Sequence, residues 1–393
     1  MGTTAFPEID VATGLIKNFP ENRLVYQRSA DFLWFFRPNS FPMLLKIIGI
    51  ALALAVAFVL ITVCVGYFYL SAPRYRGPVS DHFDGKQFIN PGGAKANGFP
   101  ELIKWMTSRQ PGPWAEVREE RYGLKPPERV GFGDLRVTFV NHSTFLIQMD
   151  GLNILTDPIY LQRVSPFQWA GPKRMRPPGI RFDDLPKIDL LLISHNHWDH
   201  LEISTVRRIA ERDHPRMLTP LGVKQFLDEN GTPGATDLDW NDAVKINDSL
   251  TVVCVRAQHF SGRGTGDRDA TLWAGYVLKS PHGNVYFAGD SGYGPFFKET
   301  GAAYGPFRLA ILPIGAYKPE WFMAPIHCSP TEAVQIHLDV RSNQSLACHF
   351  GTFPLADDGE QDPVNDLKAA LKTRQIPEER FWILKEGEGR LVL

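Results

Sequence analysis

An uncharged apolar run near the N-terminus constrains this 393-residue chain more than any other feature. The sequence IIGIALALAVAFVLITVCVGYFYL, from Ile47 to Leu70, contains no charged residue. At about 1.5 Å of rise per residue, a helix of that length exceeds a bilayer core of roughly 30 Å. A buried core helix rarely runs so far without a polar face, and the apolar part of a signal peptide is shorter and closer to the N-terminus. We therefore expect one uncleaved transmembrane helix at residues 47–70.

The flanks of the apolar run agree with a membrane span. Aromatic residues gather before it at Trp34–Phe36 and at its far end at Tyr67–Tyr69, which is typical of membrane interfaces. Basic residues are balanced near the two ends, but Lys17 and Arg23 add a slight excess to the N-terminal tail. By the positive-inside rule this excess favours a cytoplasmic N-terminus. We expect the rest of the chain on the non-cytoplasmic side of the membrane.

The chain divides by composition into four parts. We interpret residues 1–46 as an N-terminal tail, 47–70 as the transmembrane helix, 71–129 as a linker that packs on the domain, and 130–393 as the folded domain. The linker is rich in proline and glycine and contains one expected helix around Pro100 to Ser108. From Leu135 onward, short apolar runs typical of strands alternate with helical patterns, notably at Leu201–Arg212 and Pro330–Leu338. The fold class is therefore α/β.

Composition excludes several kinds of function. The 42 basic and 43 acidic residues give a net charge of −1, and no run of five basic residues occurs. This balance argues against nucleic acid as a partner. The four cysteines include no CxxC pair, so neither a disulfide framework nor a cysteine zinc site is expected.

The stretch ISHNHWDHL at 193–201 places three histidines and one aspartate within six residues. It follows a continuous apolar run that is typical of a buried strand. Other strand-like runs also end in a group that can bind metal; these groups are Asp157, His259, Asp290 and His349. In open α/β sheets, ligands bind beyond the carboxyl ends of the strands. We therefore expect these side chains to converge at one edge of the sheets.

This set of donors suits a pair of metal ions. Two ions need about six nitrogen or oxygen ligands, and one carboxylate can bridge them at about 3.5 to 4 Å. The spacing allows one ion to take His195, His197 and His259, and the other to take Asp199, His200 and His349, with Asp290 as the bridge. Taken alone, the HxHxDH run could be a solvated loop, and His259 or His349 a core or capping residue. Their joint occurrence favours the metal site.

At these residues the chain resembles the metallo-β-lactamase superfamily. The motifs are HNHWDH, Gln258-His259, AGDSGY and CHFGTF. It resembles more narrowly the N-acylphosphatidylethanolamine-hydrolysing phospholipase D branch, through LTDPIY, SPFQWAGPKR, LPIGAYKPEWFM, SPTEAVQIHLDV and LKEGEGRL. The resemblance covers roughly residues 88–393. It implies a four-layered αββα fold with two zinc ions at one edge, and it implies the ligand assignment given above.

The chain departs from the pattern of the mammalian family member at three points. It has Trp198 in place of tyrosine, Ile326 in place of glutamine, and a membrane span that the mammalian enzyme lacks. Ile326 cannot supply the hydrogen bonds of a glutamine to the N-acyl amide of the substrate.

Other residues are candidates for substrate contact, and each has a structural alternative. Arg263 matches a basic position of the family and could hold a phosphate oxygen, or could be an ordinary surface arginine. Trp198, Phe260, Trp321 and Phe322 could meet the lipid, although such aromatic residues are more often part of the core. His327 is balanced between substrate contact and structural hydrogen bonding, and we expect an outer or structural role for His142.

Together these features predict a membrane-anchored binuclear zinc phosphodiesterase of phospholipase D type, with Asp199 and Asp290 as its catalytic carboxylates. The expected reaction converts N-acylphosphatidylethanolamine-like phospholipids to phosphatidic acid and N-acylethanolamine. The expected partners are the phospholipid substrate and the bilayer. The sequence leaves open whether the protein forms a homodimer. Two alternatives also stay open: a hydrolase of a soluble lactone, amide or phosphodiester, and a non-enzymatic membrane receptor with a metal site. Structural zinc sites are usually closed and cysteine-rich, which disfavours the receptor.

Overall fold

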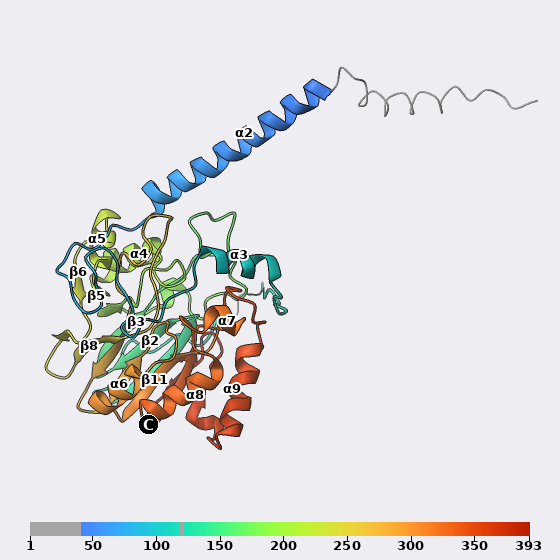
Figure 1. Cartoon of the computed structure of the whole chain (residues 1–393). Helices are drawn as coiled ribbons and strands as arrows, with labels where there is room; N and C mark the ends of the chain where they lie inside the picture. Colours follow the sequence, from blue (N-terminus) through green and yellow to red (C-terminus); the bar gives the residue numbers. More distant parts are fainter. Residues whose placement is uncertain (1–40, 118, 120–121) are drawn as a thin grey trace, which may run out of the picture. The chain divides into compact units, whose positions relative to one another are not determined.

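The computed structural model describes residues 41–117, 119 and 122–393. Its compact units are Met1–Cys64 and Val65–Leu393 (Figure 1). The basic residues of the tail and the aromatic residues Trp34–Phe36, which support the expected membrane orientation, lie outside the described residues.

The apolar run forms helix α2 (Phe41–Val65), which continues into the π-helical turn η2 (Gly66–Leu70). By length and composition, Pro42–Leu70 qualifies as a helix that could cross a membrane. Its apolar side chains are largely exposed; Leu52 and Phe58, for example, are 65% and 71% exposed. This exposure differs from the burial expected of a soluble core helix, and the helix contains the range 47–70 predicted from the sequence.

The unit Val65–Leu393 is built on two β-sheets. The strands of the first are β1 (Leu135–Asn141), β2 (Thr144–Met149), β3 (Leu152–Thr156), β4 (Leu190–Leu192), β5 (Arg216–Pro220), β6 (Ala235–Leu238) and β14 (Gly389–Leu391). Those of the second are β7 (Ala243–Lys245), β8 (Thr251–Arg256), β9 (Ala274–Lys279), β10 (Asn284–Phe287), β11 (Phe307–Pro313), β12 (Ser345–Cys348) and β13 (Phe381–Trp382). The strand orders are β14-β1-β2-β3-β4-β5-β6 and β13-β12-β11-β10-β9-β8-β7.

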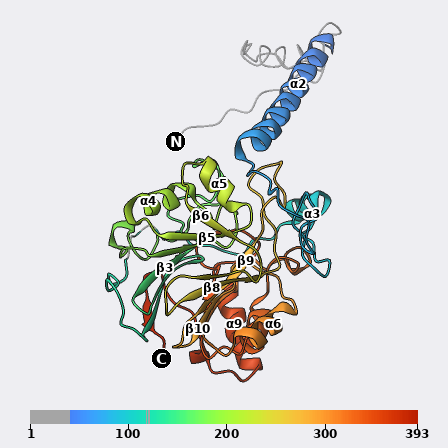
Figure 2. The same cartoon turned by 90° about the vertical axis from the view of Figure 1, so that its left-hand side faces the viewer.

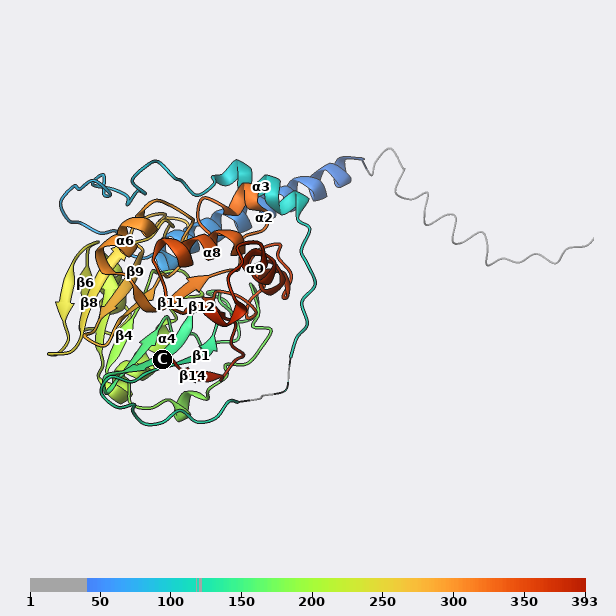
Figure 3. The same cartoon turned by 90° about the horizontal axis from the view of Figure 1, so that it is seen from below.

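Helices cover the outer faces of both sheets. They are α4 (Ile203–Asp213), α5 (Val223–Glu229), α6 (Phe296–Tyr304), α8 (Pro330–Asp339) and α9 (Asp362–Thr373), with short 3₁₀ turns η3 (Phe182–Asp184) and η4 (Glu378–Arg380). Two further helices, α3 (Phe99–Ser108) and α7 (Glu320–Met323), pack on each other through Trp105 and Phe322. Figure 2 shows α4 and α5 on the side of the first sheet, and α6 and α9 on the side of the second. Figure 3 shows α8 and α9 beside β11 and β12. The layers are α, β, β and α, so the predicted αββα fold is confirmed.

Alternation along the strands produces these layers. On β4, Leu190 and Leu192 face the core between the sheets, whereas Leu191 faces the core beneath α4 and α5. On β11, Ile311 faces the core between the sheets and Ala310 faces the one beneath α6, α8 and α9. Because successive side chains point to opposite faces, a strand covered on both sides is apolar at every position. This explains the continuous apolar runs of the sequence.

Three helices predicted from the sequence are confirmed, at α3, α4 and α8. Helix α8 begins with a capping box, in which the Ser329 hydroxyl accepts from the Glu332 amide at 3.3 Å and the Glu332 carboxylate accepts from the Ser329 amide at 2.8 Å. These two bonds satisfy amide groups that the first turn of a helix leaves without partners.

The segment 71–129 packs against the strands and loops of the folded domain as well as linking it to helix α2. Phe83 and Phe88 are buried in the core between the sheets, and the Phe88 amide donates to the Asp269 carbonyl at 2.8 Å. Further along, Arg109 pairs with Asp357 at 2.8 Å. The three predicted boundaries between the four parts stay predictions, but the segment contributes side chains to the core.

Candidate metal centre

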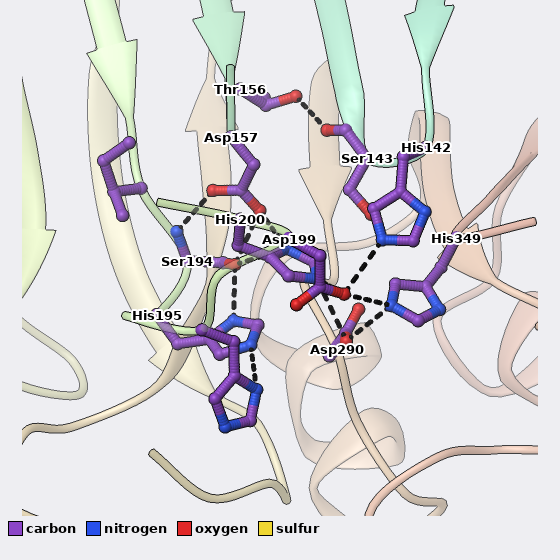
Figure 4. Close-up of polar contacts among 12 residues, drawn as sticks. His142, Ser143, Thr156, Asp157, Ser194, His195, Asp199, His200, Asp290 and His349 are labelled. Atoms are coloured by element: carbon purple, nitrogen blue, oxygen red, sulfur yellow. Dashed lines mark hydrogen bonds and ion pairs between the residues drawn. The ribbon is translucent and has the colours of Figure 1, made fainter. Parts of the chain in front are cut away.

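The donors follow strands that run in the same direction within each sheet. In the first sheet, His142 follows β1, Asp157 follows β3, and the run from His195 to His200 follows β4. In the second, His259, Asp290 and His349 follow β8, β10 and β12. Because the carboxyl ends of these strands meet at one edge, residues from across the chain converge there (Figure 4).

Three residues at this edge adopt a left-handed backbone conformation. His142, Asp157 and His349 have φ values of 46°, 34° and 57°. Residues other than glycine rarely occupy this region, and those that do cluster at functional sites. The His349 amide donates to the His142 carbonyl at 2.9 Å and so joins the two sheets at the turn. The left-handed conformation at each of these residues directs its side chain toward the donor cluster.

One group of donors consists of three imidazoles. His197 Nδ1 lies 2.9 Å from His195 Nε2 and 3.2 Å from His259 Nε2. The opposite nitrogens of two rings are engaged, since His195 Nδ1 lies 2.9 Å from the Ser194 hydroxyl and His259 Nδ1 donates to the Ile326 carbonyl at 2.8 Å. Tetrahedral ligands at about 2.1 Å from an ion lie roughly 3.4 Å apart. The spacing of the three nitrogens is close to that value.

The second group surrounds two carboxylates. Asp290 Oδ2 lies 2.9 Å from His349 Nε2, 3.1 Å from His200 Nε2 and 3.9 Å from His259 Nε2. Asp199 Oδ2 lies 3.3 Å from His349 Nε2 and 3.4 Å from His200 Nε2. Asp290 is therefore within reach of both groups, as a bridging carboxylate must be.

The residues present fit a bound cation. Among the described residues, both oxygens of the buried Asp290 side chain lack a hydrogen bond of suitable geometry, as do His197 Nε2 and His200 Nε2. A buried charge without compensation is costly. A divalent ion among these oxygen and nitrogen atoms would supply the compensation, so the donor set has the chemistry of a divalent metal site.

The histidines of the two groups differ in the direction of their pKa shifts. Burial lowers the pKa of His197 and of His259 to about 3, and the neighbouring His197 contributes to the shift of His259. These neutral imidazoles keep a lone pair free for a metal. In the second group burial opposes protonation, but the charge of Asp290 raises the pKa of His349 to about 9 and that of His200 well above its usual range. Positive charge is therefore favoured beside Asp290, as a bound cation would supply it.

Asp157 and Ser194 orient the imidazoles from outside. Asp157 Oδ2 accepts from His200 Nδ1 at 2.8 Å and from the Ser194 hydroxyl at 2.6 Å, and Asp157 Oδ1 accepts from the Ser194 amide at 2.7 Å. Such partners fix the tautomer and the direction of a metal-binding histidine. His142 has a related position, since its Nε2 lies 3.1 Å from Asp199 Oδ2.

A cavity of about 1220 Å³ opens onto the donors. Phe260, Phe322 and His327, which the sequence suggested for substrate contact, line it together with Met323 and Ile326. Its other wall comes from the segment 81–105, including Asn90, Leu102 and Trp105. This wall was not among the features predicted from the sequence, because the segment has few periodic apolar positions. The apolar face of α3 was the available signal.

Three predicted contact residues lie elsewhere. Arg263 is buried, and its Nη1 donates to the carbonyls of Asn196 and Leu201. Trp198 donates from its indole nitrogen to the Arg263 carbonyl at 3.0 Å. Trp321 is 46% exposed, with the Lys104 ammonium 4.6 Å from its ring centre. All three lie outside the described residues that line the cavity.

Comparisons with known proteins agree with this architecture. Residues 152–350 match the family described as the beta-lactamase superfamily domain. An uncharacterized protein of Mycobacterium tuberculosis is 43% identical over 247 residues, which are 62% of this chain and 65% of that protein. The N-acyl-phosphatidylethanolamine-hydrolyzing phospholipase D 1 of Caenorhabditis elegans is 36% identical over 266 residues, which are 65% of this chain and 75% of that protein.

Solved structures support the fold. A metallo hydrolase from the archaeon Ignicoccus hospitalis aligns with a TM-score of 0.51 at 20% identity, covering 66% of this chain and 98% of its own. The matched region spans just under two thirds of the mycobacterial relative's length.

The αββα layers define a fold of the metallo-hydrolase class. The histidines and aspartates clustered at the strand ends form a site of the same class. The chain belongs to the metallo-β-lactamase superfamily. Within it, the chain belongs to the branch of the N-acylphosphatidylethanolamine-hydrolysing phospholipases D, which confirms the resemblance found in the sequence.

We expect Asp157→Asn to weaken metal binding by about 10- to 100-fold, the range typical of an outer partner of a ligand. The amide cannot accept from both Ser194 and His200 as the carboxylate does, so His200 loses its fixed orientation. Competition between the detergent-solubilised protein and a chelating dye measures the change. Unchanged metal affinity would show that Asp157 does not orient the donors.

Proposed function

We propose that this chain is a membrane-anchored binuclear zinc phosphodiesterase. It hydrolyses N-acylphosphatidylethanolamine-like phospholipids on the head-group side of the phosphate, which gives phosphatidic acid and N-acylethanolamine. The observation that carries the proposal is the cavity at the donor cluster, with buried carboxylates at one end and apolar side chains along its walls.

In this proposal the two donor groups each hold one ion. His195, His197 and His259 hold the first, Asp199, His200 and His349 hold the second, and Asp290 binds both. Zinc suits imidazole and carboxylate ligands in such numbers. When bound, two such ions activate a water molecule at neutral pH and polarise the phosphoryl oxygens.

The chain's own residues orient the reactants. Asp157, Ser194 and the Ile326 carbonyl hold the imidazoles of His200, His195 and His259 through Nδ1, so that each ring presents Nε2 to the other donors. His327 faces the same space, with Nδ1 3.9 Å from Asp290 Oδ2. Burial holds the pKa of His327 well below its usual range, so the ring is neutral and can either donate to or accept from a polar group of the substrate.

The apolar wall is suited to acyl chains. This wall is formed by the side chains of Leu102, Trp105, Phe322 and Met323. The rings of Trp105 and Phe322 stack with their centroids 4.9 Å apart. Ile326 lines the same space but offers no side-chain hydrogen bond to the N-acyl amide. We therefore expect weak discrimination for the N-acyl group, and slow turnover of ordinary phosphatidylethanolamine.

The apolar helix gives a reason for a lipid substrate. A span at Pro42–Leu70 would confine the site to the bilayer surface. Lipid is abundant there, whereas a soluble metabolite gains nothing from the confinement. The catalytic unit is proposed on the non-cytoplasmic side, which rests on the basic residues of the tail.

We expect vesicles of defined N-acylphosphatidylethanolamine to yield phosphatidic acid and N-acylethanolamine, identified by mass spectrometry. Asp290→Asn removes a negative charge with little change of shape, and should lower kcat about 10²- to 10³-fold, as for loss of one preorganised electrostatic group. Asp237→Asn is the matched control. The Asp237 carboxylate accepts hydrogen bonds from the Thr219 hydroxyl and from the Gly222 and Lys224 amides, and it is not one of the proposed metal ligands.

Other products would contradict this proposal. Diacylglycerol or a lysophospholipid would place the cut at a different bond. Turnover of a monomeric soluble ester in preference to vesicle lipid would favour the soluble-substrate alternative, and no turnover of any phosphodiester by metal-loaded protein would favour a receptor.

We expect the protein to stay with membranes through washes with high salt and with alkaline carbonate, and to be released by detergent. An uncharged helix of this length inserts in effect irreversibly, whereas electrostatic attachment is lost in salt. Immunoblots of pellet and supernatant decide the matter. Release by carbonate would show that the helix does not span the bilayer.

A further inference from the structure

The loop Gly262–Asp267 lies between two parts of the catalytic unit that are distant in sequence. On one side is the donor loop Asn196–Leu201, which carries three of the predicted metal ligands, His197, Asp199 and His200. On the other is the segment Gly66–Ala72, in which the candidate span ends and the catalytic unit begins.

Hydrogen bonds hold the donor loop to Gly262 and Arg263. The Gly262 amide donates to Asn196 Oδ1 at 2.9 Å. Arg263 Nη1 donates to the Asn196 carbonyl at 2.7 Å and to the Leu201 carbonyl at 2.8 Å. The guanidinium also stacks on Trp198, 3.7 Å from the ring centre. The arginine therefore binds both ends of the donor loop.

Asp267 joins Arg263 to the segment that follows the span. Its side chain is fully buried. Oδ2 accepts from the Arg263 amide at 2.9 Å and from the Ala72 amide at 2.8 Å, and Oδ1 accepts from the Gly264 amide at 2.8 Å. Burial lowers the pKa of Arg263 to about 9, and the charge of Asp267 opposes the shift. Arg263 therefore keeps its charge at neutral pH beside a buried carboxylate.

The contact between this loop and the end of the span leaves no room for a side chain. The Gly66 carbonyl accepts from the Thr265 amide at 3.2 Å and from the Ser71 hydroxyl at 2.8 Å. A Cβ atom at Gly264 would overlap the Gly66 carbonyl and lie 2.6 Å from the Ser71 nitrogen. One at Gly266 would lie 2.7 Å from the Tyr67 ring. The glycines allow the two backbones to touch.

We infer that Arg263 and Asp267 are positioning residues, which tie the metal-donor loop Asn196–Leu201 to the end of the membrane helix at Gly66–Ala72. In the membrane-bound enzyme, the point where the chain leaves the bilayer thus helps to fix the geometry of the donors. The inference rests on the proposed metal centre. It gives Arg263 a structural task in place of the phosphate contact suggested by the sequence.

The test compares two carboxylate variants in the full-length protein. Asp267→Asn places an amide opposite three backbone N–H donors and removes the charge beside Arg263. Asp150→Asn is the matched control, since Asp150 is also buried and accepts from the Gly133 amide and the Ser280 hydroxyl at the turn between β2 and β3. Zinc affinity is measured by chelator competition, and amide exchange of residues 195–201 by mass spectrometry.

We expect Asp267→Asn to weaken zinc binding about tenfold, the lower end of the range for outer partners of ligands, and to speed exchange in the donor loop. Asp150→Asn should do neither, even where the two variants lose equal stability to denaturant. Gly264→Ala provides a second variant that removes no polar group. It displaces Gly66 and Ser71, and should speed exchange in the donor loop.

Equal loss of zinc affinity in the two carboxylate variants would overturn the inference, because general destabilisation would then explain it. Unchanged zinc affinity and exchange in both Asp267→Asn and Gly264→Ala would overturn it as well. Failure of the proposed function has a different signature, namely a wild-type protein that binds no zinc.

Discussion

The buried carboxylate of Asp290 is the constraint on which the site depends. It sits among His200, His259 and His349, and its oxygens lack hydrogen bonds of suitable geometry among the described residues. An isolated charge that is buried in this way would be costly. Protonated imidazoles can balance this charge, and so can a divalent cation bound by the same donors. The two sheets and the residues around the site hold the Asp290 carboxylate and these imidazoles close together.

The two sheets supply that architecture. Each sends strands in a common direction toward one edge, so donors separated by many residues meet where the strands end. Left-handed residues at His142, Asp157 and His349 turn the chain sharply after those strands. An outer set of groups then fixes the rings, with Asp157 bound to His200 and the Ile326 carbonyl bound to His259. The segment before β1 lines the cavity, and the loop Gly262–Asp267 is hydrogen-bonded both to the donor loop and to the segment Gly66–Ala72.

The sequence predicted what depends on local pattern and missed what depends on long-range packing. Helix α8 was predictable because Ser329 and Glu332 cap it, and the donor edge because each candidate ligand ends an apolar run. For Arg263 the sequence offered a phosphate contact or an exposed surface position, and neither matches its burial, which depends on carbonyls of a loop more than 60 residues away. For the cavity wall from the segment 81–105, the local signal was confined to the apolar face of α3.

The most direct test of the account is anomalous X-ray diffraction from crystals of the zinc-loaded protein. We predict two peaks about 3.5 to 4 Å apart, one among His195, His197 and His259 and the other among Asp199, His200 and His349, with Asp290 between them. Data on both sides of the zinc absorption edge identify the element. A single peak, a pair of peaks at other residues, or no peak from a protein loaded with zinc would contradict the binuclear centre.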